Sequence, residues 1–99
     1  MTAANDILAR ADEVRLLVAD DRVPDALLRL LDFVRDFSDD RDDVQEAILI
    51  SANFKRLEKL ERRGELEFDD ADRHRTKVLR QMLQLVDATA ERPRMLRAS

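Results

Sequence analysis

The sequence lacks the residues on which several structural classes depend. It has no cysteine, which excludes disulfide frameworks and thiolate metal sites. It has no tryptophan or tyrosine, one glycine and two prolines, so few residues would interrupt a helix. No apolar run approaches the roughly 20 residues of a membrane-spanning helix, and no signal-peptide pattern is visible. The cytoplasm is therefore the expected compartment, and a membrane is not an expected partner.

What the chain does have is many apolar and many charged residues. Apolar residues make up 44% of the 99 positions and charged residues 40%, which suits one small domain with a modest core. Residues 1–50 hold 13 acidic and 6 basic side chains, a net charge of −7, whereas residues 51–99 hold 9 acidic and 12 basic, a net charge of +3. The total of −4 disfavours a dedicated nucleic-acid binder. The asymmetry predicts two faces of opposite sign.

Apolar residues recur at helical spacing in four segments, approximately residues 6–19, 24–37, 43–62 and 70–87. The pattern predicts an all-α fold, a small antiparallel helical bundle with four main helices. Residues 1–88 are expected to form the domain. Residues 89–99 have no apolar period and include a proline, so they are expected to be a disordered tail or a linker to a missing domain.

The stretch "QEAILISANFKRLEK" (residues 45–59) contains four consecutive apolar residues, Ala47–Ile50. Four in a row cover every side of a helix, which indicates burial on several sides. The third helix is therefore predicted to be the central element, with Ile48 and Ile50 inside and Leu49 filling the core against a neighbouring helix. Beyond this point charged residues predict a helix that continues into solvent.

Several residues predict where helices begin and end. Gly64 follows a helix that ends in cations, where a left-handed residue is favoured. Asp69 is the expected N-cap of the last helix, with Phe68 as the hydrophobic staple before it. Asp43 and Glu46 resemble a capping box at the start of the third helix.

Two groups of polar residues could suggest chemistry, but each has a simpler interpretation. An acidic run could form a calcium loop, yet the glycine that such a loop needs at its sixth position is missing, so helix capping is favoured. The run consists of Asp36, Asp39, Asp40, Asp42 and Asp43. His74 is the only histidine, and neither a nucleophile nor an orienting partner can be named for it. No catalytic residue, metal or cofactor is predicted, so the chain is not expected to be an enzyme.

The basic residues between Lys55 and Arg63 allow two interpretations. They could contact phosphate, but Glu58 and Glu61 interrupt them and no aromatic platform accompanies them. A solvated face with ion pairs four residues apart is the alternative. Leu16 and Leu60 lie off the main apolar stripes, and the sequence leaves open whether they fill the core or form a contact surface.

The segment "QEAILISANFKRLEKLERRGELEFDDADRHRTKVLRQMLQLVD" (residues 45–87) resembles the bacterial effector-associated domain of type eleven. The resemblance rests on the motif Glu46–Ser51, on Phe54, on the turn glycine Gly64 and on Asp69–Asp70. "ADDRVPDALLRLLDFV" (residues 19–34) is similar to an earlier part of the same family. The similarity spans approximately residues 6–88, although His74–Thr76 departs from the family pattern.

The resemblance implies a small adaptor that acts like a death-fold or caspase-recruitment domain through homotypic association. Additional short turns would bring the four helices toward a six-helix death-like fold. The implied partners are other copies of the same or a related domain, together with an effector protease or NTPase of the parent protein or operon. The implied setting is antiphage defence and programmed cell death in bacteria. A nucleic-acid-binding or antitoxin-like helical protein is the alternative function.

The charge asymmetry predicts where copies would meet. Cations at the end of the third helix are expected to contact the acidic run of another copy, with Leu16 and Leu60 as the next candidates. The expected interaction residues are Leu16, Asp36, Asp39, Asp40, Lys55, Lys59, Leu60, Arg62 and Arg63.

Overall fold

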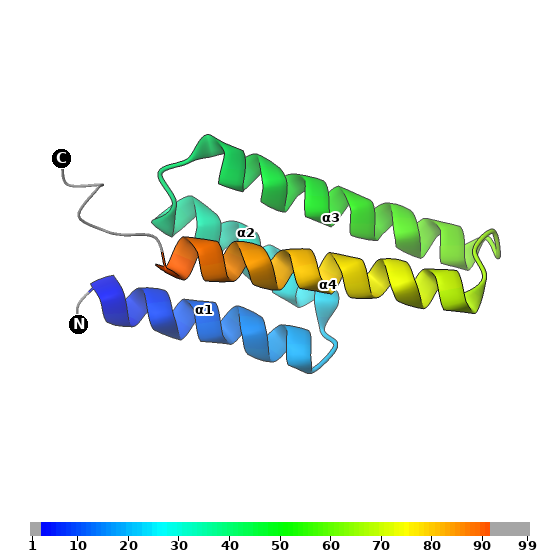
Figure 1. Cartoon of the computed structure of the whole chain (residues 1–99), viewed down its shortest axis with the longest axis horizontal. Helices are drawn as coiled ribbons and strands as arrows, with labels where there is room; N and C mark the ends of the chain where they lie inside the picture. The colour runs from blue at the N-terminus through cyan, green and yellow to red at the C-terminus, as the bar shows by residue number, and fades with distance from the viewer. Residues whose placement is uncertain (1–2, 92–99) are drawn as a thin grey trace.

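The computed structural model describes residues 3–91, with side chains from Asp6 onward, as four α-helices without a strand. The helices are α1 (Ala3–Ala19), α2 (Val23–Phe37), α3 (Arg41–Arg62) and α4 (Phe68–Glu91). Consecutive helices run antiparallel, and the ends of α3 and α4 that flank their connecting turn project beyond α1 and α2 (Figure 1). The predicted all-α bundle of four main helices is confirmed. No further short helix occurs within residues 3–91.

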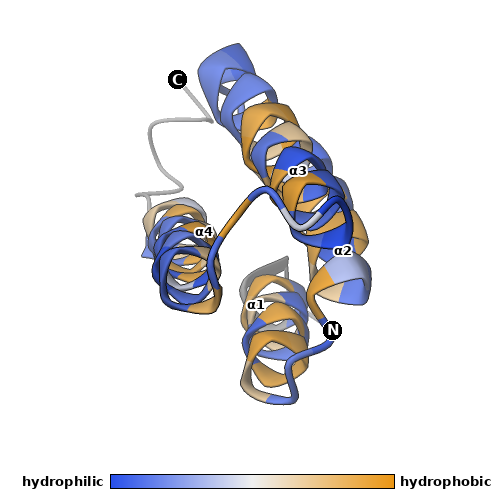
Figure 2. Cartoon of the chain, turned by 90° about the vertical axis from the view of Figure 1, so that its right-hand side faces the viewer, coloured by the Kyte–Doolittle hydropathy of each residue, from blue (hydrophilic) through white to orange (hydrophobic). Residues whose placement is uncertain are grey.

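The core is centred on α2 and α4 and not on α3. Both α2 and α4 pack against each of the other three helices, whereas α1 and α3 make no contact in the described part of the chain. Figure 2 shows α1 and α3 at opposite corners, with α4 on one side of them and α2 on the other. The largest fully buried side chains come mainly from these two central helices and include Leu30, Phe33 and Met82.

The prediction that α3 is the central helix is therefore wrong. Ile50 is buried at 3% exposure as predicted, but Ile48 is 49% exposed and Leu49 is 62% exposed. The physical reason is the helical period: Ala47 and Ile50, three residues apart, share the side that faces the core. The two residues between them point outward, because no neighbouring helix covers the outer side of a corner position.

The turn between α1 and α2 places one residue in the left-handed conformation without using glycine. Arg22 N–H donates to Leu17 C=O over 2.9 Å, and Asp21 N–H donates to Val18 C=O over 3.0 Å. These are the two bonds of a Schellman motif. Asp21 occupies the left-handed position, with a φ of 60°.

Replacing Asp21 by glycine is expected to stabilise the domain. A left-handed conformation costs a residue with a Cβ roughly 1–2 kcal/mol, and less for aspartate. Glycine removes this cost, but its greater freedom in the unfolded chain reduces the gain in stability by about 0.4–1 kcal/mol. The expected net gain in the free energy of unfolding is up to about 1 kcal/mol, measurable by urea unfolding. Asp20→Gly is the control, because Asp20 is not in the left-handed region, and it should destabilise.

The turn after α3 uses the same motif, here with the predicted glycine. Gly64 has a φ of 69°, and Glu65 N–H donates to Leu60 C=O over 3.1 Å. Lys59 and Arg62 lie in the last turn, where cations favour the negative end of the helix dipole. The prediction for Gly64 is confirmed.

Gly64→Val is expected to lower the free energy of unfolding by about 1 kcal/mol or more. A Cβ at this position meets nothing within 4 Å, so the cost comes from the backbone conformation alone. Gly64→Asn is the control and should lose less, since asparagine tolerates this conformation. A Gly64→Val melting temperature equal to that of wild type would contradict this account of the turn.

The last helix begins and ends beyond its predicted limits. It starts at Phe68, and Ala71 N–H donates to Glu67 C=O over 2.9 Å in its first turn. Phe68 is 83% exposed, so its predicted role as a hydrophobic staple is wrong. At the other end Thr89 is buried and Ala90 packs on the core, which holds α4 together as far as Glu91. The rest of the expected tail, residues 92–99, lies outside the described residues.

Candidate interaction surface

Much of the acidic run between α2 and α3 supports the fold. The Asp40 carboxylate caps α3 by accepting from Asp42 N–H over 2.9 Å. Asp43 is buried at 8% exposure and accepts a hydrogen bond from the Ser38 hydroxyl. The N-cap of α3 is therefore Asp40, three positions before the predicted Asp43. The reason is that α3 begins at Arg41.

Asp36, at the start of the acidic run, pairs with Arg10 of α1. The Arg10 guanidinium also lies 5.3 Å from the centre of the Phe37 ring, a cation–π contact. Asp39 is exposed. Within residues 3–91 no group of three histidine, cysteine or acidic side chains could hold a metal ion.

The outer face of α3 combines apolar and basic side chains. Ile48 and Leu49 are exposed on its first half, and the predicted cations Lys55, Lys59 and Arg62 are exposed on its second half, followed by Arg63. None of the four cations forms an ion pair with another described residue. The structure thus leaves both their charge and the neighbouring apolar surface available.

A groove runs between α3 and α4 and holds the predicted Leu60. It measures about 250 Å³. Its apolar wall is formed by Leu57, Leu60, Leu66 and Val78, and its exposed rim carries Arg56, Lys77 and His74. No acidic residue lines it. We call this surface the α3–α4 groove.

Leu49 lies on the same side of α3 as three residues that line this groove. Leu49, Asn53, Arg56 and Leu60 follow one another at spacings of four, three and four residues, which places them along one side of the helix. Leu60 is half-buried, so one of the two possibilities for it, a fully buried core position, does not occur. Leu16 is 66% exposed on α1, which likewise places it on the surface.

A second groove lies between α2 and α3 and has about the same size, 260 Å³. Leu28 and Leu31 of α2 and Phe54 of α3 contribute to its apolar wall. Lys55 and Glu58 lie on its rim, so the charges here are mixed. The α3–α4 groove differs from it in carrying charge of one sign.

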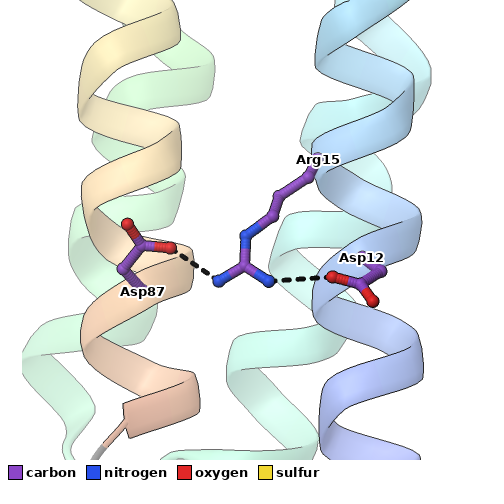
Figure 3. A network of polar contacts seen from close by, with 3 residues as sticks. All are labelled: Asp12, Arg15 and Asp87. Carbon is purple, nitrogen blue, oxygen red and sulfur yellow. Dashed lines mark hydrogen bonds and ion pairs between the residues drawn. The ribbon is translucent and has the colours of Figure 1, made fainter.

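An ion-pair network on the other side of the bundle joins α1 to α4. Arg15 donates to Asp87 over 2.6 Å and to Asp12 over 2.9 Å (Figure 3). The hydrogen bond to Asp87 raises the pKa of Arg15, while partial burial opposes the shift and Asp12 adds to it. A raised pKa stabilises the folded form at every pH below the ordinary pKa of arginine, and Arg15 therefore stays charged throughout the physiological range.

The sequence identified Leu16 as a possible surface residue but did not identify the other exposed large apolar residues that the structure reveals. Among the described residues, large apolar side chains are exposed at Leu8, Leu16, Leu28, Ile48, Leu49 and Phe68. The sequence did contain a signal for the exposure of Leu49, since Leu49 shares a helix side with Asn53 and Arg56.

None of the helices within residues 3–91 is long and apolar enough to cross a membrane.

Comparison with known proteins places this fold in a family. The family model described as effector-associated domain 11 matches residues 9–89. No curated protein and no solved structure matches the chain. The matched range begins within α1, includes α2 and α3 completely and ends two residues before the end of α4. The resemblance found in the sequence is confirmed, and the chain belongs to the effector-associated domain 11 family.

Proposed function

We propose that the chain is an adaptor domain that binds other copies of itself or of a related domain and thereby gathers effectors. The family to which it belongs is named for association with an effector. An effector protease or NTPase of the same protein or operon would supply the chemistry, in cytoplasmic antiphage defence that ends in programmed cell death. The domain itself would supply contact and no catalysis.

The observation that carries this proposal is the outer face of α3. Ile48 is 49% exposed and Leu49 is 62% exposed on a helix that has neighbours on two sides only. Leu49 lies on the same side of α3 as Arg56, a cation of the groove rim, so apolar and charged groups share one side of the helix. Protein interfaces combine an apolar centre with a charged rim in this way.

The separation of acidic and basic regions along the chain supports binding between copies. Residues 6–37, which form most of α1 and α2, carry eight acidic and five basic side chains. The second half of α3 and its C-cap instead expose Lys55, Lys59, Arg62 and Arg63, none of which forms an ion pair with a described residue. Exposed ion pairs contribute only about 0–1 kcal/mol each, so isolated domains should associate weakly. Several domains joined in one assembly would add avidity.

Leu49→Asp is the variant that tests this proposal. The folded domain should persist, because the side chain is exposed, and self-association at millimolar concentration should weaken about tenfold or more. Sedimentation velocity measures the association and circular dichroism the fold. Leu8→Asp is the matched control: it makes the same change at a leucine that is 55% exposed on α1, the helix that does not touch α3.

Two results would contradict the proposal. One is equal association of Leu49→Asp and wild type. The other is a wild-type chain that stays monomeric but shifts the mobility of DNA or RNA in a salt-dependent manner, which would favour nucleic-acid binding.

A further inference from the structure

The residues that line the α3–α4 groove define the chemistry of the partner that would bind there. Its wall is apolar, and its rim presents Arg56 and Lys77 with no acidic residue among the lining side chains. Neither cation forms an ion pair with a described residue. A ligand for this groove should therefore offer an apolar side chain accompanied by negative charge.

The same chain carries such a combination at the corner between α1 and α2. Leu16 is 66% exposed, and Asp20 follows it by four residues, which places both on one side of the helix end. Asp21 is the next residue and is also exposed. Arg22, the residue that follows Asp21, is held by Asp25 over 2.7 Å. We call Leu16, Asp20 and Asp21 the acidic corner.

We propose that the α3–α4 groove of one copy receives the acidic corner of a second copy, with Leu16 against Leu60 and Leu66 and with Asp20 and Asp21 near Arg56 and Lys77. This pairing rests on the proposed self-association and names the surfaces that carry it. The groove has about 250 Å³ of space, whereas a cavity of about 150 Å³ accepts benzene, so a leucine side chain has room.

Other exposed apolar sites fit the groove less well. Leu28 and Asp32 of α2 have the same spacing as Leu16 and Asp20, and both are exposed. Around them, Arg22 pairs with Asp25 and Arg29 with Glu13. Among the described residues this leaves Asp32 as the one carboxylate there without an ion pair, whereas the acidic corner has two, so the site offers less negative charge to a basic rim. This site provides a matched control for the acidic corner.

The groove and the corner are different surfaces, so their pairing is head-to-tail. A head-to-tail contact leaves a free groove at one end of each complex and a free corner at the other. Association should therefore continue beyond the dimer as the concentration rises. It should stop at the dimer when each partner has only one functional surface.

Two variants that each lose one surface provide the test. The groove variant is Arg56→Glu with Lys77→Glu, and the corner variant is Leu16→Ala with Asp20→Lys. All four side chains are exposed, so circular dichroism should show intact folds. Sedimentation of the full 99-residue chain should show each variant associating at least about tenfold more weakly than wild type.

Mixing the two variants is the decisive step. The corner variant keeps its groove and the groove variant keeps its corner, so the mixture should form a one-to-one dimer and nothing larger. The control variant Leu28→Ala with Asp32→Lys should associate like wild type. Variants that each associate like wild type, or a mixture that stays monomeric, would overturn the pairing while leaving self-association intact. A wild-type chain that does not associate at all would overturn the proposed function as well.

Discussion

Ile50→Asp should unfold the domain. Ile50 is 3% exposed and lies in the core cluster with Ala47 and Phe54. The substitution removes a buried side chain, which costs about 2–5 kcal/mol, and adds the penalty of burying an unpaired carboxylate, which is larger still. A domain of this length has about 5–15 kcal/mol of stability in total. Circular dichroism and thermal melting should show loss of the cooperative transition.

Ile48→Asp makes the same change two residues away and should leave the domain folded. Ile48 is 49% exposed, so its carboxylate would remain in water, and changes at such surface positions usually stay within about 0.5 kcal/mol. If Ile50→Asp melted like wild type, or if Ile48→Asp unfolded the domain, the orientation of α3 described above would be wrong.

Phe33→Ala should produce the second large loss of stability. Phe33 is fully buried on α2, the helix that contacts all three others, and its ring centre lies 5.5 Å from that of Phe37. Truncating a buried phenylalanine to alanine costs about 3–5 kcal/mol. Since about 1 kcal/mol shifts the melting temperature of a domain this size by about 4–8 °C, the expected fall exceeds about 12 °C.

Phe68→Ala provides the matched control for this truncation. Phe68 is 83% exposed, so removal of the same ring should change the melting temperature little. Equal losses at the two positions would show that burial in the α2–α4 centre is not what makes Phe33 important.

The helices were predictable from the sequence, but their arrangement was only partly so. Apolar residues three and four positions apart identified the buried side of each helix, as with Ile7, Ala11 and Val14 of α1. The run Ala47–Ile50 led to the wrong prediction that α3 is central, because composition alone cannot distinguish a helix surrounded by others from one whose outer face stays exposed. That distinction depends on the corner position of α3, which only the packing of all four helices determines.

The residues at the helix ends were likewise only partly predictable from the sequence. Gly64 was predictable as a left-handed residue because glycine is the usual occupant of such positions. Asp21 adopts the same conformation, and nothing in its identity distinguishes it from Asp20. The acidic run was predicted to be capping residues, and Asp40 confirms that role. The pairing of Asp36 with Arg10 spans 26 positions in the chain and could not be read from local spacing.

Sedimentation velocity of the wild-type chain over a rising concentration series tests self-association through an exposed surface most directly. The weight-average mass should rise from that of one chain when dilute and pass the mass of a dimer without a plateau near millimolar concentration. Added salt should lower the mass at each concentration, because the rim contacts are exposed ion pairs. A chain that keeps the mass of a monomer throughout the series would contradict the account.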